Sequence, residues 1–193
     1  MTFSELVERA KRQLNAGQGQ PRAWPESEID LAACAKQALA SLARQVMADE
    51  ARRTLLQQTY SVSLDGAGVG SPLAASGSVT GLTGEILMEG IWYGSVIDAS
   101  NNVLAPIIHY ADFLRPQPLA YAYYCLKDRK ILTRAKNVPV NGPADIVGVT
   151  GPLTITASFE PAKVENVPSE LENDLVNALC DIVARKTPAV TMT

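Results

Sequence analysis

The feature that most constrains the fold is a change in the spacing of apolar residues along the chain. Up to Val46 apolar residues recur at helical spacing, which is typical of amphipathic helices. From Thr59 they alternate with polar residues, as in half-buried strands, and helical spacing returns at Leu171. The sequence therefore predicts an α+β fold, with N-terminal helices and a C-terminal helix flanking a β-rich middle region of short, mostly antiparallel strands.

The chain is long enough to fold around one sizeable core. A chain of 193 residues can bury roughly 70% of the surface that it exposes when unfolded. We therefore expect one compact domain in three parts. These are an N-terminal helical part at 1–58, a β-rich insertion at 59–163, and a C-terminal helix with a docking tail at 164–193.

The N-terminal part carries the signals of two helices. Thr2 and Glu5 have the spacing of a capping box, and the first helix is expected to stop at the linker Gly17–Pro25. Ser27 can cap the second helix. Its apolar stripe is rich in alanine, which would let several copies pack closely, although alanine is also simply the best helix former. The residues expected at subunit contacts are Leu31, Ala35, Ala38 and Leu42.

The middle part predicts short strands separated by Gly, Pro and Asn. The clearest pair is a hairpin over Tyr121–Arg134 with a polar turn. Successive residues of its first strand should face opposite sides, Tyr123 with Cys125 and Tyr124 with Leu126. The other candidate strands are Ser78–Leu82, Ile86–Glu89, Trp92–Ile97, Val103–His109 and Leu153–Phe159.

The C-terminal part combines a marked helix start with an uncharged tail. Ser169 and Glu172 have the spacing of a capping box, and the helix is expected to run to Lys186. No residue after Lys186 has a charged side chain, so this segment suits contact with a partner better than exposure to water. The residues expected to dock on a partner are Thr187, Pro188, Ala189, Val190 and Met192.

Few residues of the chain are suited to chemistry. His109 is the only histidine, and a half-buried strand residue is its simplest interpretation. The three cysteines lie apart among apolar residues, which predicts buried free thiols and no zinc site. Gly66, Gly68 and Gly70 precede Ser71–Pro72 rather than a helix, so we expect a flexible surface loop and not a phosphate loop. The sequence thus predicts no catalytic residue, no cofactor and no metal.

The charge balance limits the partners. A net charge of −3 gives no general attraction to nucleic acid or to an anionic membrane. The hairpin has one basic patch, which is expected to be mostly solvated. Apolar runs of about 18 residues are missing, and Met1–Leu14 has the pattern of a charged helix rather than a signal sequence. We expect a protein made in the cytoplasm, with no membrane partner. The patch consists of Lys127, Arg129, Lys130, Arg134 and Lys136.

Three segments of the chain carry a resemblance to a known family. They are Tyr110–Pro116, Leu153–Pro161, and Val167–Leu171 with the helix that follows to Lys186. Together with the order of helices and strands, they resemble the head-to-tail adaptor (connector) proteins of tailed bacteriophages. In that family a strand of this type leads through a proline and an acidic link into a helix that begins Pro-x-Glu-Leu. The β-rich middle is longer here than in minimal helical adaptors.

The resemblance implies a non-enzymatic virion protein that is assembled in the host cytoplasm. Proteins of this family form a ring, usually of twelve copies, that connects the portal to the tail and lets DNA pass without sequence-specific binding. The implied partners are other copies of the chain, the portal protein, and a tail or nozzle protein, with the segment after Lys186 reaching into the portal. Three alternatives stay open: another tail component such as a terminator or baseplate piece, a small hydrolase using His109 with Cys125 or an Asp, and a ligand-binding β-domain.

Overall fold

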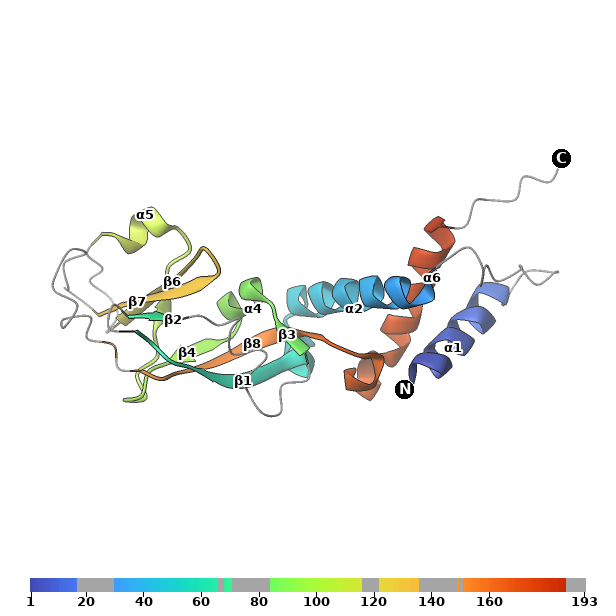
Figure 1. Ribbon diagram of the computed structural model, residues 1–193, viewed down its shortest axis with the longest axis horizontal. Coiled ribbons are helices and arrows are strands. Elements are labelled where there is room, and N and C mark those ends of the chain that lie inside the picture. Colours follow the sequence, from blue (N-terminus) through green and yellow to red (C-terminus); the bar gives the residue numbers. More distant parts are fainter. Residues whose placement is uncertain are drawn as a thin grey trace. The chain divides into compact units, whose positions relative to one another are not determined.

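The chain forms two compact units, and helices at both ends of the sequence flank a middle of mostly antiparallel strands (Figure 1). The computed structural model describes residues 1–16, 30–65, 68–70, 84–115, 122–135, 149 and 151–186. Unit 1 comprises Met1–Leu56 and Glu160–Thr193, and unit 2 comprises Gln57–Phe159. The predicted α+β class is confirmed, and the two ends of the sequence belong to one unit.

Unit 1 is helical, and its C-terminal helix packs against the two long helices of the N-terminal part. Its elements are α1 (Phe3–Asn15), α2 (Leu31–Ala48), the 3-10 helices η1 (Arg53–Leu56), η3 (Val164–Asn166) and η4 (Ser169–Leu171), and α6 (Glu172–Lys186). Contacts join α6 to both α1 and α2 (Figure 1). The apolar stripes supply a core in which Leu6, Leu42 and Leu175 are almost completely buried. Burial of each such side chain contributes about 1.5–3 kcal/mol.

The N-terminal caps are local structures that the sequence reveals in part. The capping box of α1 is confirmed, because the Thr2 hydroxyl accepts a hydrogen bond from the Glu5 amide and the Glu5 carboxylate accepts one from the Thr2 amide. The start of α2 is capped by Asp30, whose carboxylate accepts from the Ala33 amide at 3.0 Å. Ser27, the predicted cap, lies outside the described residues.

The capping box predicted at Ser169 and Glu172 is wrong. Ser169 lies in η4, which runs directly into α6, and its hydroxyl donates to the Glu170 carboxylate at 3.1 Å. Glu172 instead pairs with groups far away in sequence. Its Oε1 lies 2.7 Å from the amino nitrogen of Met1, and its Oε2 lies 3.1 Å from Nη1 of Arg9. A long-range ion pair thus takes the place of a local cap.

Unit 2 contains two four-stranded sheets within its described residues. Its elements are β1 (Gln57–Val62), β2 (Val69–Gly70), β3 (Gly84–Ile86), α4 (Met88–Trp92), β4 (Ser95–Ile97), β5 (Ala105–Pro106), α5 (Tyr110–Phe113), β6 (Ala122–Lys127), β7 (Lys130–Ala135) and β8 (Leu153–Pro161). In the first sheet β8 is central, with antiparallel β1 on one edge and β3 and β4 on the other. The second sheet has the order β2-β7-β6-β5, in which β5 runs parallel to β6.

The predicted hairpin is confirmed as β6 and β7. Lys127 pairs with Lys130, and the turn residues Asp128 and Arg129 have φ angles of 51° and 61°. Two successive positive φ angles are typical of the type I′ turn, whose twist matches that of the flanking strands.

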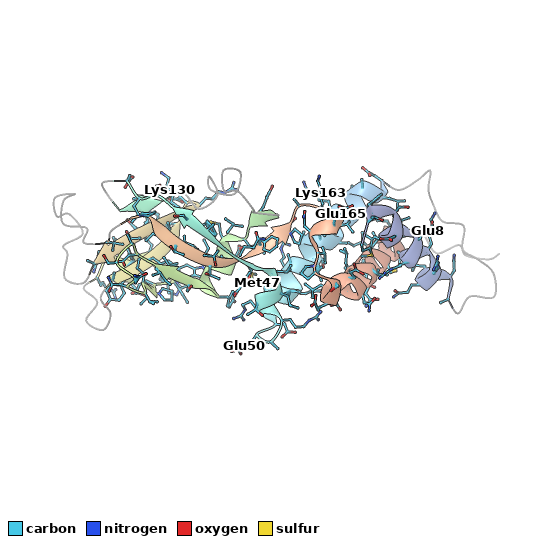
Figure 2. The ribbon with its side chains drawn as sticks, turned by 90° about the horizontal axis from the view of Figure 1, so that it is seen from below. Glu8, Met47, Glu50, Lys130, Lys163 and Glu165 are labelled. Atoms are coloured by element: carbon cyan, nitrogen blue, oxygen red, sulfur yellow. The ribbon has the colours of Figure 1, made fainter. Side chains whose placement is uncertain are left out.

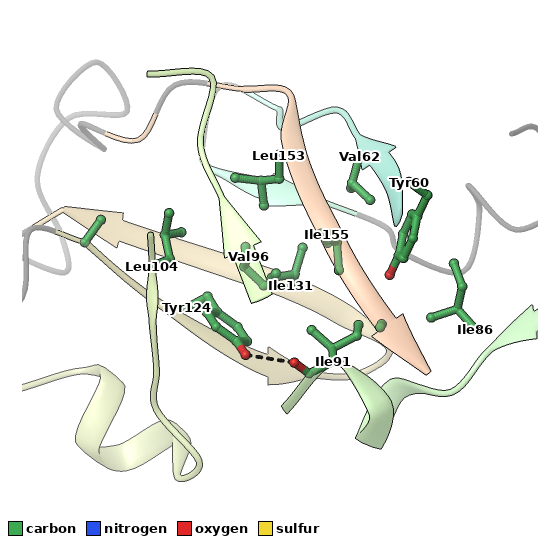
Figure 3. Close-up of a cluster of buried hydrophobic side chains, with 12 residues drawn as sticks. Tyr60, Val62, Ile86, Ile91, Val96, Leu104, Tyr124, Ile131, Leu153 and Ile155 are labelled. Atoms are coloured by element: carbon green, nitrogen blue, oxygen red, sulfur yellow. Dashed lines mark hydrogen bonds between the residues drawn. The ribbon is translucent and has the colours of Figure 1, made fainter. Parts of the chain in front are cut away.

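Tyr123 and Tyr124 face opposite sides of the hairpin, as the alternation predicts, and the structure buries both of them. Tyr123 and Cys125 form a small cluster with Phe113, while Tyr124 points into the main core of unit 2 (Figure 3). Side chains of both sheets meet in that core, which therefore joins the sheets into one unit. Its buried residues are Tyr60, Val62, Ile86, Ile91, Val96, Leu104, Ala122, Tyr124, Ile131, Leu153, Ile155 and Ala157.

Three predicted strands are partly wrong, and a fourth cannot be placed. Of the segment Trp92–Ile97 only β4 is a strand, because Trp92 is the last residue of α4. The segment Ile86–Glu89 is shared between β3 and the short helix α4, where Gly90 packs so closely that a Cβ would lie 2.8 Å from the Ser158 carbonyl oxygen. The segment Val103–His109 pairs as a strand only over β5, an edge strand in which Pro106 is tolerated because an outward-facing position needs no N–H. Beyond Ile107, whose amide donates to the Tyr124 carbonyl oxygen at 2.8 Å, the chain turns into α5. Ser78–Leu82 lies outside the described residues.

The glycines predicted to form a surface loop are packed into the second sheet. The Gly68 carbonyl oxygen accepts hydrogen bonds from the amide and the hydroxyl of Thr133, at 2.9 and 2.8 Å. Gly70 is in β2, where a Cβ would lie 2.7 Å from Cγ1 of Val62. Because both glycines are buried by tertiary contacts, their role is structural. Gly66 lies outside the described residues.

Candidate functional site

Unit 1 has an apolar groove along one face of α2, with a volume of about 340 Å³. Its floor is formed by Ala35, Leu39 and Val164, each 4% exposed. Phe3 forms a wall and leaves 39% of its surface exposed. We call this the α2 groove; its other lining residues are Ala32, Lys36, Ala162, Lys163 and Glu165. An apolar floor with a charged rim suits an apolar group of another molecule.

The charged rim of the α2 groove is unpaired within the described residues. Lys36, Lys163 and Glu165 are exposed, and no ion pair joins any of them to another described side chain. Figure 2 shows Lys163 and Glu165 on the segment that leads from β8 into α6. These charges are therefore available to a partner.

The residues predicted at subunit contacts lie on α2, mostly on its buried side. Ala38 and Leu42 are at most 1% exposed inside unit 1, and this burial alone explains their apolar character. Leu31 is half-buried. Ala35 is the member of the set that reaches the α2 groove. The subunit contacts themselves stay a prediction. The α2 groove is the part of this helix surface that is open to a contact with another copy.

Unit 2 has a larger cleft, with a volume of about 550 Å³, between the β3–α4 segment and the tip of the β6–β7 hairpin. Trp92 lines it and stacks on Tyr124, with the ring centroids 5.4 Å apart. Ile108 stands at its margin with 71% of its surface exposed. We call this the unit 2 cleft; its other lining residues are Glu85, Ile86, Leu87, Met88, Glu89, Leu126, Lys127, Asp128 and Arg129.

The basic hairpin patch is only partly solvated, because Lys127 lies over the ring of Tyr110 and Arg134 lies over the ring of Phe113. The Lys127 ammonium lies 3.8 Å from the centroid of the Tyr110 ring, which is a cation–π contact. Arg134 is buried, and its guanidinium donates hydrogen bonds to the carbonyl oxygens of Phe113 and Arg115. Arg134 thereby fixes the end of α5 to the sheet. Lys136 lies outside the described residues.

The local ion pair that the α5 segment contains is a surface feature. Nη1 of Arg115 lies 3.5 Å from Oδ1 of Asp112, and both side chains are largely exposed. Exposed pairs of this kind contribute at most about 1 kcal/mol. Between residues 103 and 114 of the sequence, the exposed large hydrophobic side chains are Val103, Ile108, Tyr110 and Leu114.

The residues considered for a nucleophilic pair have opposite environments. His109 is exposed at the N-cap position of α5, and it is not the half-buried strand residue that the sequence predicts. Cys125 is completely buried, and burial raises the pKa of its thiol. A raised pKa disfavours the thiolate that acts as a nucleophile. The prediction that all three cysteines are buried free thiols is confirmed.

The described residues include no group of three or more His, Cys, Asp and Glu side chains that could hold a metal ion. In the same part of the chain, no helix is long and apolar enough to cross a lipid bilayer. No protein-family model matches the sequence, and a search of curated proteins gives no match either. The predicted docking residues Thr187, Pro188, Ala189, Val190 and Met192 lie outside the described residues.

Proposed function

We propose that this protein is a non-enzymatic virion protein, a head-to-tail adaptor that forms a homo-oligomeric ring between a phage portal and its tail. The observation that carries the proposal is the presence of two different surfaces, the apolar α2 groove in unit 1 and the unit 2 cleft, whose lining is partly apolar and partly charged. The segments Tyr110–Pro116 and Leu153–Pro161 support it through their resemblance to the adaptor family.

Two different surfaces favour a ring over a two-fold dimer. In a dimer with two-fold symmetry the same patch of both copies meets, so one self-complementary surface is enough. In a ring each copy presents one surface to the copy before it and another to the copy after it, and a suitable rotation closes the ring. The α2 groove and the unit 2 cleft differ in size and in rim charge, as such a heterologous contact needs.

The low charge of the chain agrees with DNA that passes through without being held. A net charge of −3 gives no general attraction for the phosphate backbone. In this proposal the segment after Lys186 contacts the portal, and the tail or nozzle protein binds the other side of the ring.

The mass of the purified protein in solution tests the proposal. Light scattering after size exclusion should give a particle of many 20.6 kDa chains, twelve in the usual adaptor ring. The particle should bind purified portal protein, and a protein lacking residues after Lys186 should lose this binding while it keeps its fold. A chain that stays monomeric at all concentrations and does not bind portal would contradict the proposal. Binding to a tail tube and not to the portal would favour a terminator or baseplate piece.

A further inference from the structure

We propose that the α2 groove of one copy receives the margin of the unit 2 cleft of the next copy, with Ile108 entering the groove. The proposal rests on the ring assembly proposed above, and it commits to the surfaces that make the contact. Its occupant is therefore a second copy of this chain. Charge and apolar exposure on the two surfaces carry the argument.

The first argument is charge complementarity between the two rims. The α2 groove has Lys36 and Lys163 on its rim, and the unit 2 cleft has Glu85 and Glu89. All four side chains are exposed, and none forms an ion pair with another described residue. Opposite charges on facing rims fix the register of two proteins and exclude wrong pairings.

Two further rim charges agree with the same pairing, and Asp128 adds a third acidic side chain to the cleft. Glu165 is the acidic residue of the groove rim, and Arg129 is a basic residue of the cleft. Lys127 is already placed over the Tyr110 ring, so Arg129 is the more available cation at the hairpin tip. Each rim thus has both basic and acidic side chains, and each of them can face an opposite charge on the other rim.

The second argument is the exposure of apolar side chains on both surfaces. Ile108, at 71% exposed, is the most exposed large hydrophobic residue of the described chain, and it stands at the cleft margin. The α2 groove offers a floor of Ala35, Leu39 and Val164 for it. In return Phe3, which is 39% exposed at the groove wall, can enter the cleft beside Trp92. Mutual insertion of this kind removes both apolar groups from water.

Charge-reversal variants of the two rims test the pairing. One variant carries Lys36→Glu with Lys163→Glu, and a second carries Glu85→Lys with Glu89→Lys. Each places like charges on the facing rims, so each alone should weaken assembly by about tenfold or more in a dilution series followed by native mass spectrometry. An equal mixture should assemble like the wild type, because unlike variants alternate around the ring. The quadruple variant, with all four changes, should also assemble.

The controls separate this contact from general charge effects and from folding. Arg12→Glu with Arg44→Glu changes the net charge as the first variant does, at exposed positions that line neither surface. It should leave assembly within about twofold. Ile108→Ala should weaken assembly at least about threefold, whereas Val103→Ala, also exposed but outside the cleft lining, should not. Thermal unfolding of each variant confirms that it is folded.

The outcomes distinguish this inference from the proposed function. A wild type that forms a ring, with both charge variants assembling equally well, would overturn the pairing and leave the adaptor proposal intact. Variants that fail to assemble alone and also fail when mixed would overturn the pairing as well. A wild type that is monomeric at every concentration would instead overturn the ring itself. Assembly of the mixture and of the quadruple variant supports the pairing. Each chain in the mixture still carries its own charge reversal, so only the contact between unlike variants can restore assembly.

Discussion

The hydroxyl of Tyr124 donates a hydrogen bond to the backbone carbonyl oxygen of Ile91 over 3.1 Å, inside the main core of unit 2 (Figure 3). Tyr60 is equally buried in the same cluster, but its hydroxyl has no hydrogen-bond partner among the described residues. Burial raises the pKa of Tyr124 to about 12 and also raises the pKa of Tyr60. Both phenols are therefore protonated at neutral pH. They differ in that the buried hydroxyl of Tyr124 has a hydrogen-bond partner within the described residues, whereas that of Tyr60 has none there.

Tyr124→Phe should lower the free energy of unfolding by about 1 kcal/mol, because it removes one buried hydrogen bond. The loss stays modest since the Ile91 carbonyl oxygen still accepts from the Gly94 amide at 3.2 Å. Tyr60→Phe removes an unsatisfied hydroxyl, so it should be neutral or slightly stabilising. Urea unfolding of the two variants measures the difference. A Tyr60→Phe variant that loses as much as Tyr124→Phe would show that the Tyr60 hydroxyl has a partner after all.

Gly94→Ala should be among the most damaging single changes in unit 2. A Cβ at this position would lie 1.7 Å from the Thr156 carbonyl oxygen, at the end of the β4–β8 pairing where Thr156 pairs with Ser95, and backbone atoms cannot give way cheaply. The expected loss is about 3 kcal/mol, at the upper end of overpacking effects. Differential scanning calorimetry measures it against Ser95→Ala, which removes an atom at the next residue. Equal melting temperatures for the two variants would contradict the close approach.

Arg134→Lys tests whether the buried guanidinium fixes α5. Lysine keeps the charge but lacks the planar fork that donates to the carbonyl oxygens of Phe113 and Arg115 together. The variant should lose about 1.5–3 kcal/mol of stability, and amides of α5 should exchange hydrogen faster. Arg129→Lys, in the exposed hairpin turn, should change stability by less than about 0.5 kcal/mol. An unchanged rate of amide hydrogen exchange in α5 would show that other contacts hold this helix in place.

Local rules account for the parts of the fold that the sequence predicts. The hairpin follows from alternation and a polar turn, and the Thr2 cap follows from spacing, because both depend on residues a few positions apart. The fold class follows from the change of apolar period. By contrast, the short helix α4 lies where alternation predicts a strand. The conformation of this segment depends on the close approach of Gly90 to Ser158. No local sequence pattern encodes that tertiary contact.

The candidate surfaces depend on residues that only the tertiary fold brings together. The α2 groove combines Phe3, one face of α2 and the segment 162–165, so no window of the sequence contains it. The apolar stripe of α2 indicated a contact face, but burial against α6 explains most of that stripe. Ala32, together with Ala35 and Leu39 of the stripe, is the signal that would have indicated the groove. It is weak because two of these three residues are alanine.

The ion pairs of Glu172 should make the stability of unit 1 depend on pH in the acidic range. The hydrogen bond from the Met1 amino group, with the nearby Arg9 guanidinium, lowers the pKa of Glu172 below its ordinary value of 4.5. A carboxyl group with a lower pKa in the folded state stabilises that state above its unfolded pKa. This contribution is lost as the pH falls through the folded value. Below about pH 4.5 the wild type should therefore lose stability progressively.

Glu172→Gln removes this contribution, so the variant should have a lower urea midpoint than the wild type at pH 7. The difference between the urea midpoints of the two proteins should shrink as the pH falls below about 4.5. At low pH the Glu172 carboxylate of the wild type becomes protonated, so the wild type loses the same interaction. Glu50→Gln, at an exposed carboxylate of unit 1 (Figure 2), serves as the control and should follow the wild type. A midpoint difference for Glu172→Gln that stays constant down to pH 2 would show that the residue acts through packing and not through its charge.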